Sequence, residues 1–162
     1  MERWSRALVA VIMVGVAGCA VAADEVALSD LELEAAVREV LREVPLIDGH
    51  NDAPWAIRSR TSNHLAGFDF TDTSVIDRPM HTDIRRLRAG AVGGQFWSVW
   101  VPVDLAGPEA VVTVLEQIDL VLRLTEGYSD DFELALTADD IVRIHSGGKI
   151  ASLIGMEGGH SI

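Results

Sequence analysis

The chain has 162 residues, 49% of them hydrophobic, and a formal net charge of −12. This length suffices for one domain with a buried core. The acidic balance argues against nucleic acid as a partner, because a nucleic-acid-binding face needs a surplus of lysine and arginine. There is no internal repeat and no low-complexity tract.

Residues 1–23 are predicted to be an export signal. Arg3 and Arg6 precede the apolar run ALVAVIMVGVAG, which is too short for a membrane span. Two interpretations of its processing stay open. The sequence VAGC resembles a bacterial lipobox, in which Cys19 becomes lipidated, whereas the small-x-small sequence at 20–23 suits ordinary signal peptidase. Both predict an exported protein, periplasmic or in the cell envelope, whose membrane contact is limited to a lipid anchor.

Residues 24–162 alternate between helical and extended patterns. Five helical segments are expected, at 28–44, 53–58, 83–90, 108–127 and 137–148. Three strands are expected, at 45–52, 91–102 and 149–159, and the polar stretch 59–82 is expected to be a long loop. Strands that alternate with helices indicate an α/β fold with a parallel sheet.

The stretch PLIDGHNDAPW ends the first expected strand with polar residues at every second position. Asp48, His50 and Asp52 share one side of the strand if the extended backbone persists that far. Imidazole nitrogen and carboxylate oxygen that converge form half of a divalent-metal site. The alternative interpretation is a polar turn in which Asn51 and Asp52 serve as turn residues.

A second candidate ligand stands at the end of the last expected strand. The sequence MEGGH places Glu157 there. Because functional sites of parallel α/β proteins lie at the carboxyl ends of the strands, we expect His50, Asp52 and Glu157 to meet at one rim. The combination favours a metal site over a simple turn.

Three separated motifs carry a resemblance to a known family. LIDGHNDAPW, DIRRLRAGAVGGQFWSVWVP and KIASLIGMEGGHSI resemble, in this order, the membrane (renal) dipeptidases, which are zinc peptidases of the metal-dependent hydrolase superfamily. The resemblance covers Glu39 to Ile162. It departs from the family at Ala53, where leucine is usual, and at HSGGK, which replaces a typical RSGK loop. It implies a (β/α)8 TIM-type barrel, of which this chain would supply the first three β/α units.

The resemblance also implies a mechanism and its residues. His50 and Asp52 match the ligands of the first of two zinc ions, and Glu157 matches the carboxylate that bridges both ions. A metal-bound water or hydroxide would attack the peptide carbonyl of a dipeptide, while zinc polarises the carbonyl oxygen. Family members release two free amino acids, and many accept a D-residue on the C-terminal side.

The same comparison predicts that residues 24–162 are the N-terminal part of such an enzyme, incomplete at the C-terminus. The family's second zinc takes two histidines from later strands, which would lie beyond Ile162. None of the remaining histidines matches those positions: His64, His81, His145 and His160. We therefore expect the 162-residue chain alone to fold poorly and to lack dipeptidase activity.

Three further residues have two interpretations each. Asp48 either orients an imidazole or caps the backbone, and a direct role as ligand is the less favoured one. Trp55 either lines a substrate pocket or packs the first loop. His160 either touches the site or forms a hydrogen bond within its own loop.

Two other functions stay open at this point. One is an exported non-catalytic lipoprotein, or a truncated metal-binding product. The other is a related hydrolase acting on a different amide, although those enzymes usually carry HxH where this chain has His50-Asn51-Asp52. A homodimer is compatible with the family resemblance.

Overall fold

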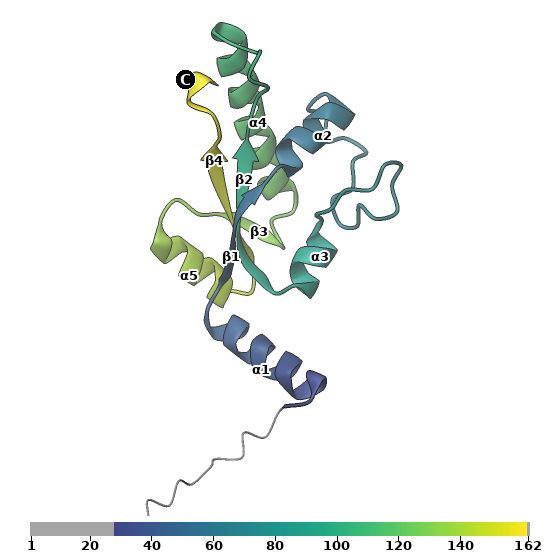
Figure 1. The fold of residues 1–162 in the computed structure, drawn as a ribbon, viewed down its shortest axis with the longest axis vertical. Coiled ribbons are helices and arrows are strands. Elements are labelled where there is room, and N and C mark those ends of the chain that lie inside the picture. The colour runs from purple at the N-terminus through teal and green to yellow at the C-terminus, as the bar shows by residue number, and fades with distance from the viewer. Residues whose placement is uncertain (1–27, 162) are drawn as a thin grey trace, which may run out of the picture.

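The structure is a computed structural model that describes residues 28–161. Four parallel strands form one sheet in the order β1-β2-β4-β3. The strands are β1 (Leu46–Asn51), β2 (Val92–Val99), β3 (Phe132–Leu134) and β4 (Ile150–Met156). Because all four run in one direction, their carboxyl ends lie at the same edge of the sheet (Figure 1).

Five α-helices and one short 3₁₀ turn accompany the strands within residues 28–161. They are α1 (Asp30–Glu43), α2 (Ala53–Thr61), α3 (Ile84–Ala89), α4 (Pro108–Gly127), α5 (Ala138–Ser146) and the turn η1 (Gly159–Ser161). All five predicted helices are therefore present, within a few residues of the expected bounds. No described helix is both long and apolar enough to cross a membrane. The predicted signal peptide and Cys19 lie outside the described residues.

The helix starts follow from local capping chemistry. Ser29 accepts a hydrogen bond from the Glu32 amide while the Glu32 carboxylate accepts one from the Ser29 amide, which forms a capping box at the start of α1. Thr137 and Asp140 form the same reciprocal pair at the start of α5. In α4, Pro108 occupies the first turn, where its missing amide costs nothing.

The two faces of the sheet carry different cores. Alternation along β2 sends Trp97 and Val99 to one face, where they join the larger apolar cluster with residues of α2 and α4. Phe96 points to the other face and packs with Leu153 and with Ile141 and Ile144 of α5. The larger core also contains an aromatic group in which Trp97 meets Phe70 and Phe132 edge to face, while the rings of Phe70 and Phe132 are tilted to each other.

The prediction of three strands is wrong by one. Three predicted strands correspond to β1, β2 and β4, and they are neighbours in the sheet as expected. The additional strand β3 pairs with β4 through Phe132, Glu133 and Leu134. Three residues are too few to display an alternating pattern, so sequence periodicity could not reveal this strand.

One glycine permits the close approach of three elements near the start of β1. A Cβ atom on Gly93 of β2 would lie 2.7 Å from Nδ1 of His145 and 2.8 Å from Cβ of Pro45. His145, in α5, also lies 3.2 Å from the carbonyl oxygen of Arg42 in α1 through its Nε2 atom. The end of α1, the entry into β1 and the end of α5 therefore meet at this glycine.

Candidate metal centre

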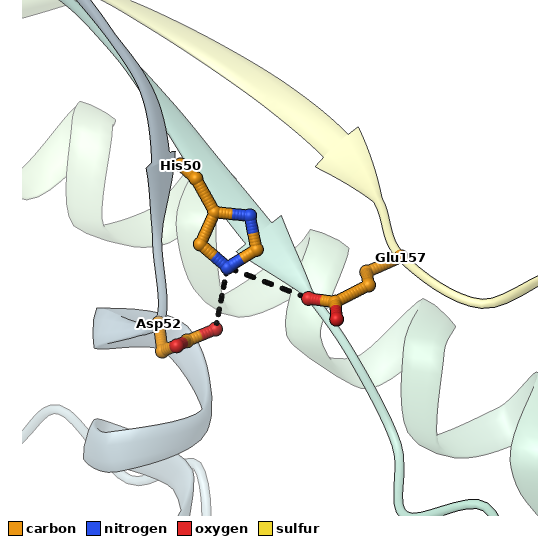
Figure 2. A group of neighbouring side chains, drawn as sticks. All are labelled: His50, Asp52 and Glu157. Atoms are coloured by element: carbon orange, nitrogen blue, oxygen red, sulfur yellow. Dashed lines mark hydrogen bonds and ion pairs between the residues drawn. The ribbon is translucent and has the colours of Figure 1, made fainter.

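Three potential ligands converge at the carboxyl edge of the sheet. Nε2 of His50 lies 3.2 Å from Oδ1 of Asp52 and 3.4 Å from Oε2 of Glu157. Figure 2 shows the same ring nitrogen facing both carboxylates, which come from the end of β1 and the end of β4. One donor atom from each residue lies within 4.8 Å of the other two. All three side chains are about half exposed, so the group is open to solvent and solutes.

Asp52 follows β1 and occupies the N-cap position of α2. An aspartate at this position usually accepts a hydrogen bond from the first turn of the helix. Here its side chain makes no such bond, and the carboxylate faces His50 instead. The prediction of one continuous extended run through residue 52 is wrong in this detail, because the backbone of Asp52 has already left the strand conformation (φ −82°, ψ 16°).

Glu157 is held by its neighbours in β2. Its amide donates a hydrogen bond to the carbonyl oxygen of Val99, which continues the pairing of β4 with β2 by one residue. The hydroxyl of Ser98 donates to Oε2 of Glu157 at 3.0 Å. The chain then turns at Gly158 with φ +88°, a conformation that favours glycine. The Glu157 carboxylate is thus fixed by backbone pairing and by a buried serine.

The three residues with two interpretations lie around this group. Asp48 caps the backbone, because its Oδ1 atom accepts a hydrogen bond from the amide of His50. Trp55 of α2 packs edge to face against Trp100, with ring centroids 5.1 Å apart. His160 places Nε2 3.4 Å from the carbonyl oxygen of Pro102 and does not join the three-residue group.

A pocket of about 330 Å³ adjoins the group on the side of α2. Its wall is formed by the end of β1, the start of α2 and the end of the long loop: His50, Asn51, Asp52, Ala53, Ala56, Arg60, Pro79, Met80, His81 and Thr82. Among the histidines without a predicted role, His81 lines this pocket. His145 lies at the opposite end of the sheet, beside Gly93.

A buried ion pair fixes the loop that precedes α3. The Asp83 carboxylate is fully buried and lies 2.7 Å from Nη2 of Arg86. Burial alone would raise the pKa of Asp83, but hydrogen bonds from the Arg86 side chain and from the amides of Arg86 and Thr73 outweigh it and lower the pKa to about 2. The charged carboxylate thereby ties residue 73 to the start of α3 and fixes the neighbouring residue Thr82.

Two residues that support the ligands are not among the predicted site residues. The side chain of Asn51 lies behind the ligands, where it bonds to Thr82 and to the buried Gln95. Ser98 was not singled out, although its place in β2, one residue before that strand's end, is the signal that could have revealed it. Both roles depend on pairing between distant strands, which sequence spacing does not specify.

Comparisons with known proteins are consistent with this geometry. The model of the family "Membrane dipeptidase (Peptidase family M19)" matches residues 34–162. Dipeptidase ataJ of Aspergillus terreus is 46% identical over 134 residues, which are 77% of this chain and 32% of that protein. Dipeptidase 3 of Macaca fascicularis is 40% identical over 132 residues, which are 82% of this chain and 25% of that protein. The chain thus spans about a third or less of the length of these relatives.

Solved structures share the fold. A dipeptidase described as a metallo peptidase of family M19 superposes with a TM-score of 0.62 at 22% identity, over 74% of this chain and 37% of that one. A metallo peptidase from Rhodobacter sphaeroides, liganded with a phosphinate mimic of L-Ala-D-Ala, gives a TM-score of 0.62 at 19% identity, over 74% of this chain and 40% of that one. At these identities the likeness concerns the parallel α/β fold.

Proposed function

Because this chain belongs to the membrane dipeptidase family, peptidase family M19, we propose that it contributes the first zinc ligands of an enzyme that hydrolyses dipeptides. The observation that carries the proposal is the convergence of His50, Asp52 and Glu157 at the carboxyl edge of a parallel sheet. In the whole protein we expect β1, β2 and β4, which are neighbours in this order, to belong to an eight-stranded barrel.

The donor set fits zinc in type and in spacing. One imidazole nitrogen and two carboxylate oxygens are common zinc ligands, and ligands at about 2.0–2.2 Å in a tetrahedron lie roughly 3.3–3.6 Å apart. The separations of 3.2 and 3.4 Å from Nε2 of His50 to the two carboxylates agree with that spacing. Three protein ligands are the number that typically holds a catalytic zinc, whereas structural zinc sites typically use four.

Glu157 has a further feature that suits a site with two ions. Its Oε2 atom faces His50 and accepts from Ser98, whereas within residues 28–161 its Oε1 atom makes no hydrogen bond or ion pair. In Figure 2 the second oxygen points away from the imidazole. A carboxylate with one oxygen engaged and one free can bridge two cations. We therefore propose that Glu157 would also serve a second zinc, for which residues 28–161 bring no further group of ligands together.

The protein residues have defined tasks in this proposal. When bound, a divalent ion polarises the carbonyl of the peptide bond and lowers the pKa of a bound water molecule toward neutral pH. His50 and Asp52 hold their donor atoms on a short turn between β1 and α2, and Glu157 approaches from β4. The adjoining pocket of about 330 Å³ is at the small end of ligand sites and suits a substrate as small as a dipeptide.

The test measures hydrolysis by the native gene product that carries these residues. Release of free amino acids from L-Ala-L-Ala and L-Ala-D-Ala is followed before and after removal of metal by a chelator. We expect activity with zinc, loss after chelation, and recovery when zinc is restored. An active protein that keeps its full rate without metal would refute the metallopeptidase proposal. A protein that binds zinc but cleaves no dipeptide would favour the non-catalytic alternative.

We also propose that the 162-residue chain alone is inactive. It carries ligands for one ion and one free carboxylate oxygen, and the open edge of β1 leaves backbone groups unpaired. Purified 162-residue chain should therefore aggregate or unfold without a sharp transition, and should not cleave dipeptides. A soluble monomer with cooperative unfolding and measurable turnover would contradict this proposal.

We also propose that the protein is exported to the cell envelope and carries a lipid on Cys19. The support is the arrangement of Arg3 and Arg6, the apolar run and the sequence VAGC. Mass spectrometry of the mature N-terminus tests it. An acylated Cys19 is expected, whereas a free Ala23 or Asp24 would show cleavage by ordinary signal peptidase.

A further inference from the structure

Asn51 stands between two of the candidate ligands and makes three hydrogen bonds with the protein behind them. Its Nδ2 atom donates to Oγ1 of Thr82 at 2.9 Å and to Oε1 of Gln95 at 3.3 Å. Its Oδ1 atom accepts from the amide of Ala53 at 3.0 Å. One side chain thus ties the end of β1 to β2, to the residue before Asp83, and to the start of α2.

The start of α2 leaves the Asp52 carboxylate without a partner in the helix. The first amides of a helix need acceptors, and an N-cap aspartate normally accepts from the second or third of them. Here Asn51 accepts from the amide of Ala53, the first helical residue, and the second residue, Pro54, has no amide. The Asp52 side chain makes no bond to the helix and faces His50.

The partners of Asn51 are themselves held in place. Gln95 is fully buried, and its Nε2 atom donates to the carbonyl oxygens of Asp48 and Phe96. Thr82 adjoins the buried Asp83, and its carbonyl oxygen accepts from the hydroxyl of Thr73. The Asn51 amide is therefore anchored to two rigid parts of the fold.

We propose that Asn51, anchored by Thr82 and Gln95, is the positioning residue that fixes His50 and Asp52 in their metal-binding arrangement. The proposal rests on the zinc site proposed above. Residues that orient metal ligands from behind typically change metal affinity about 10–100-fold when mutated. Asn51 bonds to groups behind the three ligand atoms and acts through the backbone of its two neighbours, His50 and Asp52.

The test is a double-mutant cycle on zinc affinity in the native gene product. Asn51→Ala removes all three bonds, and Thr82→Val removes one acceptor while keeping the side-chain shape. Zinc dissociation constants come from competition with a chromophoric chelator, and cobalt substitution reports ligand geometry through its visible absorption. Thr125→Val is the matched control, because Thr125 is buried in α4 near the opposite end of the sheet.

We expect zinc affinity to fall about tenfold in Thr82→Val and about 10–100-fold in Asn51→Ala, with an altered cobalt spectrum in both. The double variant should bind no more weakly than Asn51→Ala, because Thr82 acts through Asn51. Thr125→Val should leave affinity and spectrum unchanged.

Two outcomes would overturn the proposal, and they differ from failure of the zinc site itself. Unchanged zinc affinity and cobalt spectrum in both variants, with only a lower melting temperature of the metal-free protein, would make Asn51 merely structural. If the loss of zinc affinity in the double variant equalled the product of the two single losses, Thr82 would act independently of Asn51. If the unchanged protein binds no zinc, the proposed function fails together with this inference.

Discussion

The two faces of the sheet differ in burial and in role, although the same strands form both. On one face, Trp97 of β2 is completely buried under α2 and α4 among aromatic rings. On the other, Phe96 and Leu153 are covered by α5, and beyond them Ser98 supports Glu157 at an open rim. Neighbouring residues of one strand thus serve stability and chemistry separately, so mutations on the two faces should be distinguishable by measurement.

The largest effect is expected at the open rim, from His50→Ala. Loss of the one imidazole, which faces both carboxylates, should lower dipeptide turnover by the native gene product about 10³-fold or more, because a catalytic metal supplies several kcal/mol of barrier reduction. Unfolding by urea should change little, since His50 is about half exposed. His64→Ala, at an exposed loop residue, is the control. Full activity in His50→Ala would contradict the proposed metal centre.

The closed face should give the opposite result in Trp97→Ala. Trp97 is fully buried, and its Nε1 atom donates to Oγ of Ser152. Its truncation should cost about 3–5 kcal/mol of unfolding free energy, measured by urea denaturation. Phe96→Ala, one residue away on the other face and not fully buried, should cost less than Trp97→Ala. Equal losses would mean that the two faces do not differ as described.

The Asp83 network should give a pH dependence of stability. Its folded pKa of about 2 lies below the ordinary value of 3.8, so its contribution is present above about pH 4 and is lost as the pH falls toward 2. The shift corresponds to about 2 kcal/mol. Asp83→Asn should therefore be less stable than the unchanged protein at neutral pH, and the difference should shrink between about pH 4 and 2. A difference that is constant with pH would contradict the assigned charge.

The smallest effect compares two serines on neighbouring strands. Ser98→Ala removes the hydrogen bond to Glu157 and should weaken zinc binding about fivefold, which corresponds to about 1 kcal/mol. Ser152→Ala removes the acceptor of the Trp97 indole and should lower stability while leaving zinc affinity unchanged. Chelator competition and urea denaturation distinguish the two. If Ser98→Ala and Ser152→Ala bound zinc with the same affinity, Ser98 would not orient Glu157.

Sequence patterns predicted what depends on local chemistry. The predicted helices at 28–44 and 108–127 are set by neighbouring residues, and both were confirmed. The parallel sheet followed from alternation of strands and helices, and the rim position of Glu157 from its place at a strand end. Resemblance of three motifs to a family then assigned roles that spacing alone had left open.

What sequence could not predict depends on contacts between distant segments. The strand β3 exists because Phe132 to Leu134 pair with β4, and not because of an internal pattern. The bonds from Asn51 to Thr82 and Gln95 join residues 31 and 44 positions apart. The Asp52 carboxylate makes no bond to the start of α2, although an aspartate at the N-cap usually does. Only the three-dimensional arrangement accounts for this difference.

The junction at Gly93 has a consequence for how this sequence can vary. Since even a methyl group there would overlap Pro45 and His145, no amino acid but glycine fits without separating β1 from β2. In a library that samples all twenty residues at this position, survivors should carry glycine alone, whereas Gly49, whose surroundings are empty, should accept alanine. At these two glycines, tolerance to substitution is thus set by the space around the residue.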